Sequence, residues 1–195
     1  MRGTVGSYPL TPEVRSIEAL ETAAKLLRGL HDAGADFEGR DSDVWMLPPR
    51  SGADTICHGD FAPYNCAFDG RAAVGVIDFD TAHPAPRSWD IAYALYRFAP
   101  LTAAGNLDGF GDIREQGKRA RLFCDAYDLE MSLRSLLPEL VAERLTALAD
   151  FMRGAASEGD ETFKSNIKAG HLAIYLKDIE YVRRNSDRIR ESLTS

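Results

Sequence analysis

Four polar residues in the middle of the chain have the types and spacing of a catalytic loop. His58, Asp60 and Asn65 form an H-x-D-x-x-x-x-N string, and thirteen residues after the Asn an apolar segment ends in Asp78. Phosphoryl transfer needs one carboxylate to orient the attacking hydroxyl, and hard oxygen ligands to hold Mg²⁺ on the phosphates. The spacing therefore predicts a phosphoryl-transfer site that uses Asp60, Asn65 and Asp78.

His58 and Asp90 are expected to support this loop. His58 has two alternatives, a general base or a bracing residue, and its position two residues before Asp60 favours bracing by hydrogen bonds. Asp90 follows Asp78 by twelve residues and falls in the first turn of an expected helix, where a carboxylate interacts favourably with the helix N-terminus. We expect Asp90 both to stabilise that helix and to hold the loop.

The segment before the string predicts one helix and one loop. Apolar residues at helical spacing predict a helix over residues 11–34, starting at Thr11 and Pro12. Residues 35–53 are rich in Gly, Asp, Ser and Pro, which is typical of a loop.

The segment after the string predicts a β-hairpin. Residues 65–68 and 72–77 flank the dipeptide Asp69-Gly70, which favours a tight turn with positive φ at its centre. The hairpin would bring Asn65 and Asp78 together.

The rest of the chain predicts helices. Trp89, Tyr93 and Tyr96 have two alternatives, stacking on a ligand or packing in the core, and their helical pattern favours the core. The expected helices are 88–98 with Ser88 as cap and Pro100 as stop, 113–129 capped by Asp112 and Glu115, Pro138 to about Gly154, and Asp160 to beyond Tyr181 with Phe163, Ile167, Ile174 and Tyr181 inward. The fold class is therefore mainly α, within α+β, with one small hairpin carrying the polar site.

Composition is that of a soluble globular protein. The chain has 195 residues, of which 45% are hydrophobic and 27% charged, enough to bury one core. It has neither an apolar run that would span a bilayer nor the pattern of a signal peptide, so we expect a cytoplasmic protein without membrane contact. Cys57, Cys66 and Cys124 lack C-x-x-C spacing and predict free thiols.

The charge balance bears on partners. The formal net charge is −7, and no run of basic residues exceeds two, so we expect no nucleic-acid partner. An acidic protein favours a cationic small substrate. Glu158, Asp160 and Glu161 form an acidic cluster that would receive one, although a solvated turn with a helix cap is the more common role of such a cluster.

Three strings together carry a family resemblance. HGDFAPYN at 58–65, GVIDFD at 75–80 and WDIAYAL at 89–95 resemble the aminoglycoside phosphotransferase and choline kinase group of the protein-kinase-like superfamily. The resemblance is close over about residues 50–100, and the flanking helices agree with that family's helical lobe. Some chains with the variants FAPYN and IDFDTAHP are likened to peptide-toxin immunity proteins, so antibiotic resistance as a specific role does not follow.

The resemblance implies roles for the polar residues. Asp60 would be the catalytic base, Asn65 and Asp78 would bind Mg²⁺, and His58 and Asp90 would support the loop. The cofactors implied are Mg²⁺ and ATP or another nucleoside triphosphate. Asp80 stands where a kinase D-F-G string has its glycine, a departure that small-molecule kinases tolerate.

The resemblance also implies a domain organisation. We expect residues 1–195 to form the helical C-terminal lobe of a protein-kinase-like fold, with residues 1–12 as a remnant of the interlobe linker. The β-rich N-terminal lobe of kinases supplies a glycine-rich cover and a strand lysine. Before His58 the only lysine is Lys25, inside the expected helix, so we expect that lobe to be absent.

Two functions from different classes remain open. The first is an ATP- and Mg²⁺-dependent phosphotransferase that acts on a hydroxylated small molecule bound between the catalytic loop and the C-terminal helices. The second is a kinase-derived binding or immunity module without catalysis. A lobe that lacks its partner lobe would expose apolar surface, which favours a homodimer or a partner chain over that face.

Overall fold

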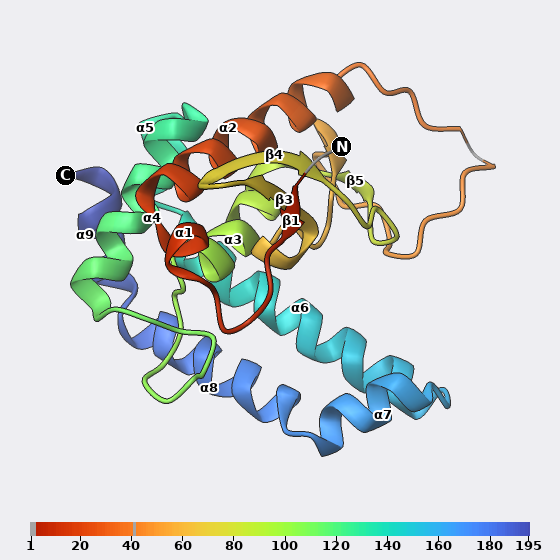
Figure 1. Ribbon diagram of the computed structural model, residues 1–195. Coiled ribbons are helices and arrows are strands. Elements are labelled where there is room, and N and C mark those ends of the chain that lie inside the picture. The colour runs from red at the N-terminus through yellow and green to blue at the C-terminus, as the bar shows by residue number, and fades with distance from the viewer. Residues whose placement is uncertain (1–2, 41) are drawn as a thin grey trace.

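The computed structural model describes residues 3–40 and 42–195. These residues are mainly helical and contain two small antiparallel sheets, which confirms the α+β class (Figure 1). Of the expected linker at 1–12, Met1 and Arg2 lie outside the described residues. The remainder of that segment contains strand β1 (Thr4–Val5) and the first residue of helix α1 (Pro12–Arg15).

The first expected helix is two helices. α1 ends at Arg15, and α2 (Ile17–Gly34) begins after Ser16, whose backbone is extended. The Ser16 hydroxyl accepts a hydrogen bond from the Ala19 amide at 3.1 Å and so caps α2. The prediction of one continuous helix was wrong here, because this serine stops and restarts the helix.

The hairpin is present as predicted. β3 (Cys66–Asp69) pairs with β4 (Ala72–Val76) around Gly70, which has a positive φ of 61°. β1 pairs antiparallel with the other edge of β3. Beyond β4, the Ile77 amide donates to the Asn65 carbonyl oxygen at 3.0 Å, so the hairpin returns the chain to the catalytic loop.

A second sheet, which the sequence pattern did not predict, closes the segment that contains the site. β2 (Thr55–Cys57) pairs antiparallel with β5 (His83–Ala85), and Cys57 lies opposite His83. Strand β2, which leads into the catalytic loop, therefore lies beside β5, which follows the hairpin.

Helix α3 (Arg87–Phe98) follows β5 and forms the centre of the core. Ten of its residues, Trp89 to Phe98, are buried. Pro86 occupies the N-cap position and Ser88 lies inside the helix, so the prediction of Ser88 as cap was wrong. Trp89, Tyr93 and Tyr96 are buried, as the core alternative predicted, and Trp89 and Tyr93 also line the cavity described below.

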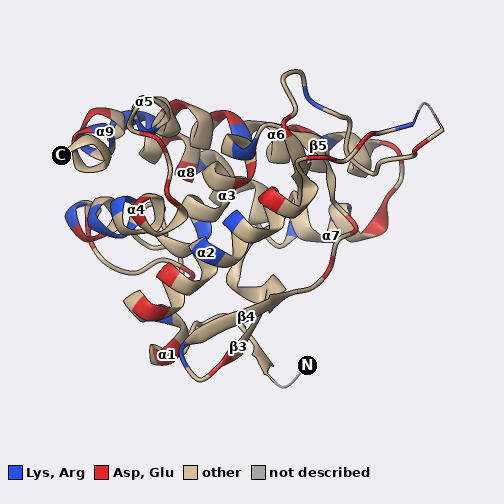
Figure 2. Cartoon of the chain, turned by 90° about the horizontal axis from the view of Figure 1, so that it is seen from above, with Lys and Arg blue, Asp and Glu red and all other residues tan. Residues whose placement is uncertain are grey.

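Of the helices after α3, α6 (Leu137–Ser157) and α4 (Ile113–Tyr127) pack against it most extensively, whereas α7 (Glu161–Lys168) lies away from it at the far end of α6 and α8 (His171–Arg184) (Figure 1). Asp112 caps α4 by accepting from the amides of Arg114 and Glu115, as predicted, and the short α5 (Met131–Arg134) was not predicted. α6 has Pro138 in its first turn and packs on α3 and α8. Figure 2 shows charges of both signs along α4 and α9.

The last expected helix is three helices. They are α7 (Glu161–Lys168), α8 (His171–Arg184) and α9 (Ser186–Thr194). Gly170 separates the first two with a positive φ of 93°, a conformation that glycine adopts without strain. The break resets the helical face, so Ile174 is exposed, contrary to prediction, and Asp178, Ile179 and Val182 are buried.

The three cysteines are free and buried, as predicted. Within the described ranges we find no helix with both the length and the apolar character needed to cross a bilayer.

Candidate functional site

Asp60 and Asn65 lie together at the ends of one tight loop between β2 and β3. Asn65 closes the one-turn helix η1 (Pro63–Asn65), and its Nδ2 donates to both Oδ2 and the main-chain oxygen of Asp60, each at 2.9 Å. Because Nδ2 is committed to Asp60, Oδ1 of Asn65 points away from it. Among the described residues, none donates a hydrogen bond to that oxygen.

The Asp60 carboxylate is half-buried and held on both sides. Tyr64 donates its hydroxyl to Oδ1 at 2.7 Å, and the Tyr93 hydroxyl lies 2.9 Å from that of Tyr64. Burial raises the pKa of Asp60 above its usual value, against the opposing effects of the two tyrosine hydroxyls and the positive charge of Arg144. Each carboxylate oxygen accepts one of these hydrogen bonds, from Tyr64 or from Asn65, and an ionised carboxylate oxygen has the capacity to accept another from a ligand hydroxyl.

Both ring nitrogens of His58 form hydrogen bonds that brace the loop. Its Nε2 donates to the Ile77 carbonyl oxygen at 2.9 Å, and its Nδ1 accepts from the Asp60 amide at 3.2 Å. Only the Nε2-protonated tautomer satisfies both contacts. The ring therefore ties the catalytic loop to the end of the hairpin, and its one lone pair is not free to take a proton from a substrate.

Asp90 anchors the loop from α3. It is fully buried, and its two oxygens accept from the amides of His58 and Gly59 at 2.6 and 2.9 Å. His31 Nε2 lies 3.2 Å from Oδ2. Burial alone would raise the pKa of Asp90, but the hydrogen bonds that it accepts from His31 and from the His58 amide outweigh this effect and hold that pKa below its usual value.

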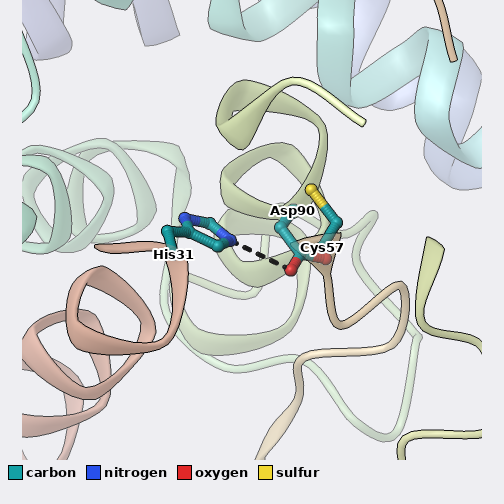
Figure 3. A group of neighbouring side chains, drawn as sticks. All are labelled: His31, Cys57 and Asp90. Carbon is teal, nitrogen blue, oxygen red and sulfur yellow. Dashed lines mark hydrogen bonds and ion pairs between the residues drawn. The ribbon is translucent and has the colours of Figure 1, made fainter. Parts of the chain in front are cut away.

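His31, Cys57 and Asp90 lie close enough to suggest a metal site (Figure 3). The Cys57 thiol lies 3.3 Å from the Pro86 carbonyl oxygen and donates to it, and burial raises the pKa of that thiol. A metal would require the thiolate. His31 also contacts the Tyr127 hydroxyl through Nδ1 at 2.7 Å. The group is therefore a brace that links α2, β2 and α3.

Asp78 lies at the exit of the hairpin. It is exposed, has a positive φ of 63°, and directly follows Ile77, which is bonded to Asn65. Aspartate is one of the few residues that tolerate this conformation. Together with Asn65 Oδ1 it offers hard oxygen donors, the set that Mg²⁺ prefers, so the residues present fit that ion.

A cavity of about 390 Å³ opens beside Asp60. It lies between the catalytic loop, α3, the helices α6 to α8 and the segment from Met46 to Arg50, the region where we expected an acceptor. Its lining is mostly aromatic and apolar, and Asp60 is the only carboxylate that the described residues contribute to it. Arg50, Arg144 and His171 also line it.

Comparison with known proteins identifies the family. The model of the phosphotransferase enzyme family matches residues 11–127, well over half of the chain. The chain belongs to this family. A curated relative, the trifolitoxin immunity protein of Rhizobium leguminosarum bv. trifolii, is 29% identical over 125 residues. The alignment covers 61% of this chain and 48% of that protein, so the chain spans about half the length of its relative.

The phosphotransferase family match contains the whole loop and Asp90 but stops before α6. The cavity wall made by α6, α7 and α8 lies beyond residue 127. The family match therefore includes the residues expected to take part in the chemistry, and it does not include the cavity wall formed by α6, α7 and α8.

The acidic cluster lies outside that wall. Glu158, Asp160 and Glu161 are exposed at the turn between α6 and α7 and do not line the cavity. Asp160 caps α7 by accepting from the amides of Thr162 and Phe163, and Glu161 pairs with Lys164 at 2.8 Å. This geometry favours the helix-cap alternative over contact with a substrate.

Two residues around Asp60, Tyr64 and Arg144, were not predicted, and contact of Tyr93 with a ligand was only the less favoured of its two alternatives. Tyr64 stands inside the string itself, four residues after Asp60, and that closeness was a usable signal. Arg144 was detectable as a charged residue on the apolar stripe of Val141, Leu145 and Leu148. Nothing local to Tyr93 separates a core tyrosine from one at the site.

Proposed function

We propose that this phosphotransferase-family chain transfers the γ-phosphate of ATP, or of another nucleoside triphosphate, to a hydroxyl group of a small molecule in the presence of Mg²⁺. The observation that carries the proposal is the Asp60 carboxylate, held by Tyr64 and Asn65 at the wall of a cavity large enough for an acceptor. We also propose that the helical part with its hairpin corresponds to the C-terminal lobe of a protein-kinase-like fold.

Asp60 would act as the base. The acceptor hydroxyl oxygen forms a bond to the γ-phosphorus, the bond from that phosphorus to the bridging oxygen breaks, and the hydroxyl proton passes to Asp60. A raised pKa supports this role because it makes the carboxylate a better proton acceptor at neutral pH. His58 and Asp90 would keep the carboxylate in place through the loop backbone.

Asn65 and Asp78 would hold the metal. Bound Mg²⁺ would neutralise charge on the phosphates and fix their orientation. Asn65 contributes by presenting Oδ1, which its own bond to Asp60 orients. Asp78 contributes a carboxylate beside the exposed apolar side chains of Ile77 and Phe79, a surface suited to a nucleotide base or to a second chain.

A binding or immunity function without catalysis is the second candidate. It is supported by the name of the curated relative, an immunity protein, and by the span of about half of that protein. In that case the cavity would hold a small molecule or a peptide side chain. The polar loop would then have only a structural role, retained from an ancestral enzyme.

Two measurements separate the candidates. Wild-type chain is incubated with ATP, Mg²⁺ and a panel of hydroxylated compounds, and phosphorylated product is sought by mass spectrometry against an Asp60→Ala control. Thermal unfolding is followed with and without ATP and Mg²⁺. Product above the control, and nucleotide stabilisation that Asp78→Ala removes, support the enzyme. Absence of both favours the binding module.

A further inference from the structure

Arg144 is a buried cation at the candidate site that forms no ion pair with the described residues. The residue is 5% exposed, and among the described residues no carboxylate lies within ion-pair distance of its guanidinium. Its Nη2 donates to the Gly59 carbonyl oxygen. Its Nε is enclosed without a hydrogen-bond partner. Burial of a guanidinium without an ion-pair partner costs free energy, and a bound anion would offset that cost.

The neighbours of Arg144 aim it at the cavity. Its guanidinium carbon lies 4.7 Å from the ring centre of Tyr93 and 5.3 Å from that of Trp89, and all three residues line the cavity beside Asp60. Cation–π contacts of this kind place the guanidinium without neutralising its charge. Within the part of the chain that the structure describes, no acceptor contacts its Nη1.

No other charged group among the described residues of the lining forms an ion pair with Arg144. Asp60, the only carboxylate among those residues, interacts with Arg144 only through space, and its oxygens accept hydrogen bonds from Tyr64 and Asn65. The guanidinium carbon of Arg50 lies 3.4 Å from the ring centre of Trp89, and its Nη2 lies 3.1 Å from Oε1 of Glu143, with which it forms an ion pair. The cavity thus combines a cation that forms no ion pair with the described residues and an aromatic and apolar wall.

From these contacts we propose that the acceptor carries a carboxylate that binds Arg144, an aromatic or branched apolar body, and a hydroxyl directed at Asp60. The wall that would contact the body includes Leu148, Phe151, Phe163 and Tyr175. This inference deepens the proposed function and rests on its acceptor site. It reverses the substrate charge that the net charge of −7 favours, because the local lining and not the whole surface meets the ligand.

A matched series of ligands tests the charge requirement without any catalytic step. Binding of 3-(4-hydroxyphenyl)propanoate, its neutral amide and the cationic amine tyramine is measured by calorimetry in the absence of nucleotide. We expect the acid to bind ~10-fold or more tightly than the amide, since a charge-assisted hydrogen bond replaces a neutral one. Tyramine is expected to bind most weakly. Failure of phosphate transfer would not affect this result, so the two proposals fail separately.

Variants assign the preference to Arg144. Arg144→Gln is expected to abolish the preference for the acid over the amide, and Arg144→Lys is expected to retain part of it. The matched control is Arg153→Gln, an exposed arginine of the same helix that does not line the cavity, and it is expected to leave the preference intact. Thermal unfolding checks that each variant folds. Equal binding of acid and amide by the wild type, binding of none of the three, or a preference that survives in Arg144→Gln would overturn the proposal.

A competition experiment separates a carboxylate from a phosphate as the anion. Inorganic phosphate is titrated against the bound acid in wild-type chain and in Arg144→Gln. Weak competition supports the carboxylate. Phosphate that binds more tightly than the acid, and only when Arg144 is present, would assign the guanidinium to the transferred phosphate and overturn the carboxylate assignment.

Discussion

Asn65 donates a hydrogen bond from Nδ2 to Oδ2 of Asp60 at 2.9 Å. This one contact orients two groups that the proposed reaction needs, because it holds the carboxylate of the proposed base and turns the amide oxygen of the proposed metal ligand outward. The two side chains therefore behave as a unit, and a change in one is expected to affect the task of the other.

Replacement of Asn65 tests that unit. Asn65→Ala removes both the bond to Asp60 and the Oδ1 ligand, whereas Asn65→Asp keeps an oxygen ligand and loses the donor. We expect transfer rates to fall ~100-fold or more in the alanine variant, and the aspartate variant to recover part of the Mg²⁺ affinity but not the rate. Initial rates over a Mg²⁺ titration measure both effects. Equal Mg²⁺ affinity in the two variants would contradict the role of Oδ1.

Asp90 is expected to be essential for stability. Asp90→Asn replaces a carboxylate that receives two loop amides and contacts His31 by a group that accepts through one oxygen only. The buried network would then be left incomplete, at a cost of about 3 kcal/mol or more of unfolding free energy. Urea unfolding measures it. Asp128→Asn, an exposed aspartate, is the control and should change little. An equally small change in the unfolding free energy of Asp90→Asn would contradict the role of Asp90 as the anchor of the loop.

The same residue predicts a pH dependence of stability. The folded-state pKa of Asp90 lies below its unfolded value, so its ionised form contributes stability that is present above the unfolded value near 4 and lost as pH falls through the folded value. The difference in unfolding free energy between wild type and Asp90→Asn should therefore shrink at acid pH. A difference that stays constant from neutral pH to acid denaturation would contradict this assignment.

Tyr64 is expected to tune the base. Its hydroxyl bond to Asp60 opposes the rise in pKa that burial causes, so Tyr64→Phe should raise that pKa further. Transfer needs ionised Asp60, and the acid limb of the pH–rate profile should move to higher pH in the variant. Tyr181→Phe, which removes a hydroxyl bonded to the remote Gln116, is the control. An unmoved limb in Tyr64→Phe, or an equal shift in the control, would count against a direct effect on the base.

Local signals in the sequence were sufficient for the loop and the hairpin. The turn at Gly70 and the apolar runs beside it determine β3 and β4, and the spacing within the string placed Asp60 and Asn65 together. β2 and β5 pair residues that are nearly thirty positions apart in the sequence. No local turn signal connects them, so the sequence pattern did not predict this sheet. Breaks at Ser16 and Gly170 were missed because the apolar period continues through both.

The surroundings of the site depend on distant contacts. Tyr93 and Arg144 reach the loop from α3 and α6. The apolar stripe of α6 indicates that Arg144 is unusual, but the contact of either residue with the loop follows from packing between distant segments. For the same reason the residues that line the cavity could not be derived from the net charge. Net charge describes the whole surface, whereas the lining is selected by which few side chains the helices turn inward.

The proposed chemistry is tested most directly by one comparison of rates. The initial rate of phosphate transfer from labelled ATP to a hydroxylated acceptor, with Mg²⁺, is measured for the wild type and for Asp60→Asn, with thermal unfolding as the check that both are folded. We predict labelled product from the wild type and a rate about 100- to 10,000-fold lower for the variant. Equal rates in the two proteins, or no labelled product from folded wild-type chain with any acceptor, would contradict the assignment of Asp60 as the base of a phosphotransferase.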